Sequence, residues 1–198
     1  YHPTQVLTSA HSHYATPLGE IPIDQKTLQK VCEDFKNESS IEIEFVRNDD
    51  EHSLEIELPF LQCALAKPFD LLPLMLRSRD QRLTEVLGGV IANCLAGKSA
   101  LLVASSDLSH FYPQRYAEQL DSEMLSQVAA FSPSGVIGAE LAGTGFACGA
   151  AAIATVLVAA RKLGANEVKI LHHSTSGDTT GDNSSVVGYG AAVVLKKE

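Results

Sequence analysis

The sequence predicts an α/β fold: a three-layer α/β/α sandwich around a mixed, mostly parallel central sheet. Three observations support this class. Helix-type and strand-type segments alternate along the chain, a continuous apolar run at 99–105 has the composition of a strand buried on both faces, and two strand-type segments close the chain. A single domain over residues 1–198 is expected, because one core can grow to this size before a chain divides.

In the first half of the chain, the spacing of apolar residues distinguishes helices from strands. Asp24 is a typical N-cap, and the apolar residues that follow at 28–35 recur at helical spacing, so a helix is expected there. Residues 41–46, IEIEFV, alternate apolar side chains with glutamates, which indicates a half-buried strand. A further helix is expected to begin near Ser53, disturbed at Pro59.

The second half continues the alternation. Residues 69–76 have the pattern of a short buried strand, and Asp80 opens a helix whose apolar stripe continues to Leu95. Residues 99–105, SALLVAS, are expected to form a strand inside the sheet. The remaining expected elements are helices around 116–128, from Ser132-Pro133 and over 148–163, and strands over 167–174 and 186–195.

Composition limits the partners and the compartment. The formal charge is −9 and no basic cluster stands out, so no nucleic-acid partner is expected. The longest apolar run, 148–160, is shorter than the ~20 residues that a bilayer span needs, so no membrane partner is expected either. Four cysteines without CxxC spacing favour reduced thiols in a cytoplasmic protein, and Cys32, Cys63 and Cys94 are expected to be core residues.

The clearest candidate site follows the expected strand at 99–105, in SSDLSH. Ligands of open α/β sheets bind at the carboxyl ends of strands, and Asp107 and His110 are placed there. A carboxylate beside an imidazole fixes the ring tautomer and supports a general base. The alternative is that Asp107 only caps the turn with Ser105 and Ser106.

Two other segments carry chemistry. His52 lies among acidic residues that include Glu51, which indicates either a functional cluster or a solvated helix entrance. Cys148 follows glycines and precedes a helix, where a thiol is activated by the helix N-terminus. The alternative for Cys148 is close packing of small residues where that helix enters the core.

Six short motifs in order carry a resemblance that spans the chain: HP near the start, ATPLGEIPID, DDEHSLEIELPFLQ, ASSDLSHF, ACGA, and TSGDTTGD followed by VVGYGA. Together they resemble the Memo family, whose prokaryotic members include AmmeMemoRadiSam system protein B. Memo proteins are similar in fold to class III (LigB-type) extradiol dioxygenases. The resemblance therefore implies a mononuclear non-haem iron or copper site at the carboxyl ends of the sheet.

Residue by residue, the resemblance implies that His2 and Cys148 are metal ligands. It gives Asp107 and His110, which match a pair that lines the metal site, as catalytic residues. It gives the same role to Glu51 and His52, which match the family's EHS motif. The family's PHAGY motif, which carries another ligand histidine, does not occur in this sequence. The chain is therefore expected to lack the family's N-terminal strand and helix, or that half of the site.

Three functions follow as hypotheses. The first is a metal-binding or redox accessory protein of an AmmeMemoRadiSam system, with radical-SAM system proteins as partners and an oligomer allowed. The second is an active extradiol-type dioxygenase that acts on a small aromatic substrate, with His110 moving protons. The third is a hydrolase that combines Ser105, Ser106 or Cys148 with His110 and Asp107, although no GxSxG motif is present.

Overall fold

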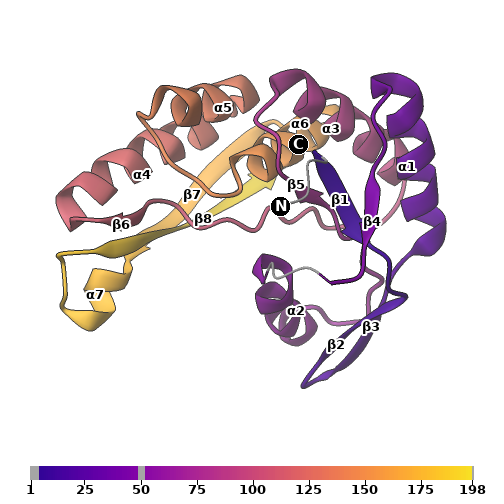
Figure 1. The fold of residues 1–198 in the computed structure, drawn as a ribbon, viewed down its shortest axis with the longest axis horizontal. Coiled ribbons are helices and arrows are strands. Elements are labelled where there is room, and N and C mark those ends of the chain that lie inside the picture. The colour runs from indigo at the N-terminus through magenta and orange to yellow at the C-terminus, as the bar shows by residue number, and fades with distance from the viewer. Residues whose placement is uncertain (1–4, 49–51, 198) are drawn as a thin grey trace. The chain divides into compact units, whose positions relative to one another are not determined.

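The computed structural model describes residues 5–48 and 52–197. The chain divides into two compact units, up to Ser78 and from Arg79 onward, which are described separately. Both units mix helices and strands, so the predicted α/β class is confirmed (Figure 1). The predicted single central sheet is not what the described residues form. Their strands pair in three small sheets of two or three strands each.

The N-terminal unit contains two of these sheets. One has the order β4-β1-β5, with β4 parallel and β5 antiparallel to β1. The other is a β2-β3 hairpin, which the sequence patterns did not predict. The bounds of these elements are β1 Val6–Ser9, β2 His13–Thr16, β3 Gly19–Pro22, α1 Gln25–Ser39, β4 Glu44–Val46, α2 Ser53–Ala64 and β5 Met75–Leu76.

The two helices of this unit were predicted. The side chain of Asp24 accepts a hydrogen bond from Thr27 N at 2.9 Å and caps α1. Helix α2 begins at Ser53 and continues through Pro59. The strands are shorter than predicted, since β4 covers three residues of 41–46 and β5 two residues of 69–76.

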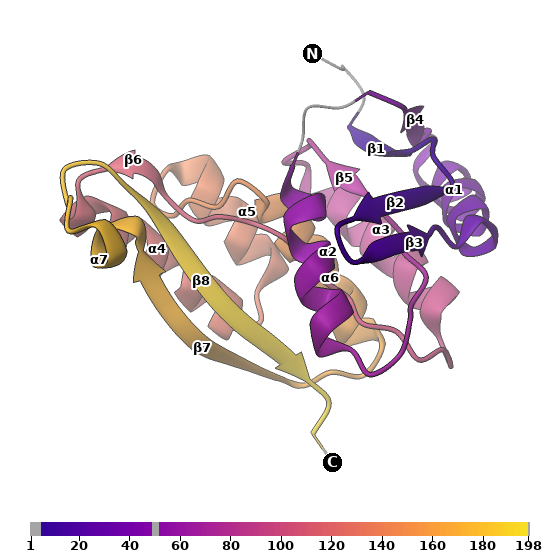
Figure 2. The ribbon, with the colours of Figure 1, turned by 90° about the horizontal axis from the view of Figure 1, so that it is seen from below.

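The C-terminal unit holds the remaining helices and one sheet, in the order β6-β8-β7, with both pairings antiparallel. Figure 2 shows β7 and β8 as a long twisted pair, and α4 packs against it. The bounds are α3 Gln81–Leu95, β6 His110–Tyr112, α4 Gln114–Ala129, α5 Pro133–Ala142, α6 Ala150–Lys162, β7 Glu167–Thr175, α7 Ser176–Thr180 and β8 Val186–Leu195.

Small residues let the two central helices of this unit approach closely. Helix α3 packs on α6. A Cβ atom on Gly88 would lie 2.7 Å from the Cβ atom of Val158 and 2.8 Å from the carbonyl oxygen of Thr155, distances that real side chains do not adopt. The Ala-rich sequence of α6 and Gly88 in α3 therefore have a packing reason.

The segment 99–105 departs most from its prediction. It is extended but belongs to none of the strands of the described structure, and Leu101 and Val103 are 62% and 46% exposed. An apolar pocket of about 760 Å³ lies between this segment, α6 and the end of β8. Strand composition alone did not produce a strand here, because a β-strand also needs a neighbouring backbone with which to pair.

The polar loop between the last two strands contains a short helix, α7. The side chain of Asp178, at the third position of α7, caps the backbone N–H of Thr175, the N-cap residue. The N–H of Thr175 donates to Asp178 Oδ2 at 2.7 Å, and this bond lowers the pKa of the Asp178 carboxyl. Ser176 Oγ accepts from Val187 N at 3.0 Å, which ties α7 to β8.

The cysteines only partly follow their prediction. Cys94 is buried and Cys32 is half-buried, where burial raises the pKa of its thiol. Cys63 is exposed, so its prediction as a core residue was wrong. It lies five residues after the buried Leu58 on α2, about 140° around the helix, and therefore faces away from the side that Leu58 packs.

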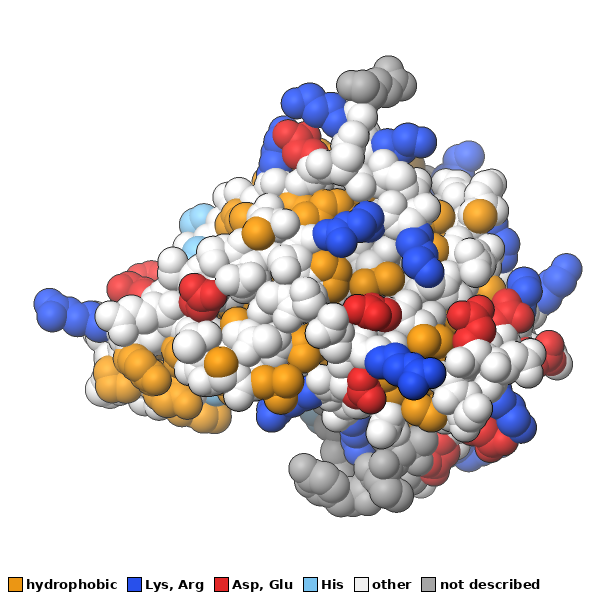
Figure 3. Space-filling view, turned by 90° about the horizontal axis from the view of Figure 1, so that it is seen from above, with side chains coloured by type: hydrophobic (Ala, Val, Ile, Leu, Met, Phe, Trp, Pro, Cys, Tyr) orange, Lys and Arg blue, Asp and Glu red, His pale blue; other side chains and the backbone are white. Residues whose placement is uncertain are grey.

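On the face shown in Figure 3, basic and acidic side chains are interspersed among apolar ones. Among the helices of the described residues, none is both long and apolar enough to span a bilayer.

Candidate functional site

The loop that carries Asp107 and His110 is anchored to strand β8. Leu108 N donates to Gly188 O at 2.9 Å, and Gly188 N donates back to Ser109 O at 2.8 Å. Leu108 is also buried. These bonds hold the backbone immediately before β6, so the side chains on either side of Leu108 start from a fixed position.

The start of helix α6 packs against the same loop. Cys148 N donates to Asp107 O at 3.1 Å, and Gly149 N donates to Ser106 Oγ at 2.8 Å. A Cβ atom on Gly149 would lie 2.6 Å from Ser105 O, so only glycine allows this approach. This close packing explains why a glycine follows the cysteine in the ACGA motif. Its glycine brings the cysteine before it onto the loop.

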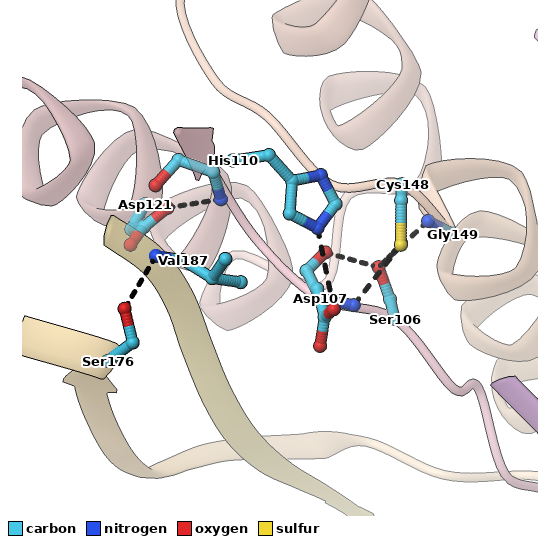
Figure 4. Close-up of polar contacts among 9 residues, drawn as sticks. Ser106, Asp107, His110, Asp121, Cys148, Gly149, Ser176 and Val187 are labelled. Atoms are coloured by element: carbon cyan, nitrogen blue, oxygen red, sulfur yellow. Dashed lines mark hydrogen bonds and ion pairs between the residues drawn. The ribbon is translucent and has the colours of Figure 1, made fainter. Parts of the chain in front are cut away.

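The sulfur of Cys148 lies at the surface of this contact. Asp107 N donates to Cys148 Sγ at 3.2 Å, and Ser106 Oγ lies 3.7 Å from the same sulfur. Cys148 is exposed, so the alternative that it only fills a packed core is wrong. In Figure 4 the His110 ring lies above Asp107, and Cys148 and Ser106 lie to its right.

Asp107 and His110 form a loose pair. Their Oδ2 and Nε2 atoms are 3.4 Å apart, and their side chains are 49% and 27% exposed. The His110 ring also contacts two aromatic rings: Phe146, edge to face at 5.4 Å between centroids, and Phe111, tilted at 5.7 Å. An exposed pair of this kind contributes little to stability, so its side chains can reorient toward a ligand.

The structure thus brings together Asp107, His110 and Cys148, which are separated by up to 41 residues in the sequence. His52 belongs to the N-terminal unit, where it precedes α2 and its Nδ1 lies 2.7 Å from Glu55 Oε1. Both side chains are exposed, and the pair lies at the entrance of the helix. The predicted site residues His2 and Glu51 lie outside the described residues.

Two residues beside the loop were missed by the sequence patterns. Asp121 on α4 is fully buried, accepts from Ser109 N at 2.8 Å and lies 2.8 Å from Nε2 of His173 on β7. A signal was available for Asp121, since it falls on the apolar face of its helix, four residues after Ala117 and three before Met124. For His173 no sequence spacing gives a signal.

The donor types of the loop suit a soft or borderline metal, since thiolate and imidazole favour iron(II), copper or zinc. The loop has too few of these donor side chains for a complete ligand set. Within residues 5–48 and 52–197, no three His, Cys, Asp or Glu side chains gather closely enough to hold one ion. The described residues therefore supply part of a ligand set at most.

The fold and the loop define a class: a mixed α/β protein with an exposed cysteine held against an Asp-x-x-His loop. The family model for Memo-like proteins matches residues 1–193, and the chain belongs to the Memo-like protein family. It is 31% identical over 186 residues to a MEMO1 family protein of Nitrosopumilus maritimus, covering 94% of this chain and 66% of that protein.

A second relative gives the same result. The MEMO1 family protein Mbar_A1422 of Methanosarcina barkeri is 32% identical over 183 residues, which cover 91% of this chain and 67% of that protein. The chain therefore spans about two thirds of the length of the curated relatives it matches. The predicted resemblance to the Memo family is confirmed.

Proposed function

We propose that this chain is a metal-binding or redox accessory protein that holds an iron or copper ion through the Cys148 thiolate. One observation carries the proposal: Cys148 is exposed, and its sulfur lies against the loop that carries Asp107 and His110. When bound, the ion would supply Lewis-acid or one-electron chemistry at this loop.

The residues around the sulfur have distinct tasks in this proposal. Asp107 N–H donates to the sulfur, and hydrogen bonds to thiolate ligands tune the properties of the bound metal. His110, oriented by Asp107 and packed on Phe146, offers an imidazole that either binds the ion or moves a proton next to it. His2, the other ligand that the family resemblance implies, would complete the set from outside the described residues.

The accessory role is preferred over a dioxygenase because it requires only that an ion is held at this loop, whereas a dioxygenase also requires open coordination positions for oxygen and a substrate. The AmmeMemoRadiSam resemblance supports radical-SAM system proteins as partners. The hydrolase hypothesis is weaker still. The hydroxyl of Ser106 donates to Asp107 O at 2.7 Å and accepts from Gly149 N, so its hydrogen bonds hold the loop to α6 rather than prepare an attack.

Elemental analysis of the purified protein tests the proposal. We expect iron or copper at up to one per chain, lost in Cys148→Ala and retained in Cys63→Ala, the matched variant of another exposed cysteine. Metal at equal content in both variants would contradict a Cys148 ligand. Oxygen consumption with catechol would then distinguish an active dioxygenase from a metal-binding accessory protein.

A further inference from the structure

The buried carboxylate of Asp121 joins three separate segments. One oxygen accepts from the Ser109 N–H of the loop, and the other lies 2.8 Å from the His173 ring on β7. The backbone of β8 passes close to the same carboxylate, since a Cβ atom on Gly188 would collide with it. A fully buried carboxylate is stable only where donors surround it, and here the donors come from the candidate loop and from the sheet.

Ser109 connects the Asp121 carboxylate to the candidate site through its backbone N–H. Ser109 lies between Asp107 and His110 in the sequence, two positions after the first and one before the second. Its backbone is held on both sides, by the bond from Gly188 N to its carbonyl and by the bond from its N–H to Asp121. Figure 4 shows Asp121 and Cys148 on opposite sides of His110 in this view.

We propose that Asp121 is a positioning residue, held in place by His173, that fixes the backbone of the Asp107–His110 loop so that its side chains face Cys148. This inference rests on the proposed metal function for its effect on binding, but its geometric part does not depend on that function. Ser109 itself contributes through its backbone, because its buried side-chain oxygen has no hydrogen-bond partner in the described structure.

Four substitutions distinguish the contribution of the Asp121 carboxylate from those of the His173 ring donor and of the Ser109 side chain. Asp121→Asn keeps the shape but replaces one acceptor oxygen with an NH₂ group, so either Ser109 N–H or the His173 ring loses its acceptor. His173→Phe removes the ring donor, whereas His173→Gln keeps an N–H donor at a similar reach. Ser109→Ala is the matched control, because it removes only an unpaired hydroxyl and retains the backbone donor.

Cobalt(II) alone is the binding probe, because its absorption reports a bond to the thiolate of Cys148. We expect the cobalt Kd to rise about tenfold or more in Asp121→Asn and His173→Phe, the size typical of lost outer-shell partners. In His173→Gln and Ser109→Ala it should stay within about threefold of the original protein. Unchanged cobalt affinity in Asp121→Asn and His173→Phe, with only stability reduced, would show that the pair is merely structural and overturn the proposal.

Hydrogen exchange keeps the two proposals apart. If the original protein binds no cobalt through Cys148, the proposed metal function fails, and the positioning role is decided by the amide of Ser109 and that of Asp107. Both should exchange about tenfold faster in Asp121→Asn than in Ser109→Ala, since a backbone donor without its acceptor is exposed more often. Equal exchange rates in these two variants would refute the positioning role.

Discussion

Two aspartate–histidine pairs lie on either side of Ser109, and they differ in distance, exposure and sequence separation. Asp107 and His110 belong to one loop, lie 3.4 Å apart and are 49% and 27% exposed. Asp121 and His173 come from a helix and a strand 52 residues apart, lie 2.8 Å apart, and the aspartate side chain is fully buried. In our proposals the same chemical pair therefore has two roles: the exposed pair is available to a ligand, and the buried pair holds backbone in place.

The two pairs differ because water reaches the carboxylate of Asp107 and is excluded from that of Asp121. A carboxylate in solvent keeps its hydration and gains little from a partner, so its pair stays adjustable. A carboxylate removed from water must have donors, and losing one leaves an uncompensated charge. Burial thus converts a weak pair into a strict geometric constraint, and exposure keeps the neighbouring pair available for chemistry.

The largest expected effect is on stability. Asp121→Ala should lower the free energy of unfolding by about 3 kcal/mol, because it leaves the Ser109 N–H and the His173 ring without their acceptor. Asp107→Ala, the matched change in the exposed pair, should cost less than about 1 kcal/mol. Urea unfolding followed by circular dichroism measures both. Equal losses would mean that burial does not distinguish the pairs.

A smaller effect is expected where the backbone approaches the buried pair. Gly188→Ala places a methyl group against the Asp121 carboxylate and should cost about 2 kcal/mol, as for other overpacked sites. Gly138→Ala is the control, since a Cβ atom there meets nothing within 4 Å and the residue lies inside α5. That change should leave stability unchanged or raise it by up to about 1 kcal/mol through helix propensity. If Gly188→Ala were as harmless as this control, the carboxylate would not be tightly enclosed.

The two pairs also show what the sequence could predict. Asp107 and His110 were found because they lie three positions apart, and a short spacing places side chains together without knowledge of the fold. Asp121 and His173 were missed because their contact depends on how α4 packs on β7. The signal that remained was local: a charged residue on the apolar face of a helix needs a partner, although the sequence does not say which.

The same limit explains the sheet. Helices such as α1 and α3 were predicted, because capping and helical spacing are properties of one continuous segment. Strands depend on a neighbour chosen by the whole fold. Residues 99–105 therefore read as a buried strand yet lie extended outside the strands of the described structure. Cys148 was likewise placed at a helix entrance, and the close approach of Gly149 to Ser105 emerged only from the packing.

A second buried carboxylate, Glu140, tests whether a single exposed partner is enough to compensate a buried charge. The Glu140 side chain is 6% exposed and meets Arg79, 61% exposed, at 2.8 Å. Burial raises the pKa of Glu140, and Arg79 offsets part of that rise. Because the folded protein holds this proton more tightly than the unfolded chain does, the contribution to stability is complete below the unfolded carboxyl pKa. It is lost as the pH rises through the raised pKa of the folded state.

The matching variant is Glu140→Gln. It should equal the original protein in stability at about pH 4 and be at least as stable at about pH 7, where the original carboxyl is ionised. Thermal unfolding across this pH range measures the difference. A Gln variant that is less stable at neutral pH would show that Arg79 compensates the buried charge of Glu140 fully. Glu140 would then resemble Asp121, whose charge is compensated by its hydrogen-bond donors.

The smallest expected change concerns access rather than stability. If the Asp107–His110 loop is open, iodoacetamide should alkylate Cys148 in the folded protein about as readily as the exposed Cys63. The buried Cys94 should react only after denaturation, and Cys32 should react slowly because burial raises the pKa of its thiol. Mass spectrometry of peptides after timed labelling measures all four. If Cys148 were protected as strongly as Cys94, the Asp107–His110 loop would be closed to solvent. The contrast between this exposed pair and the buried Asp121–His173 pair would then be lost.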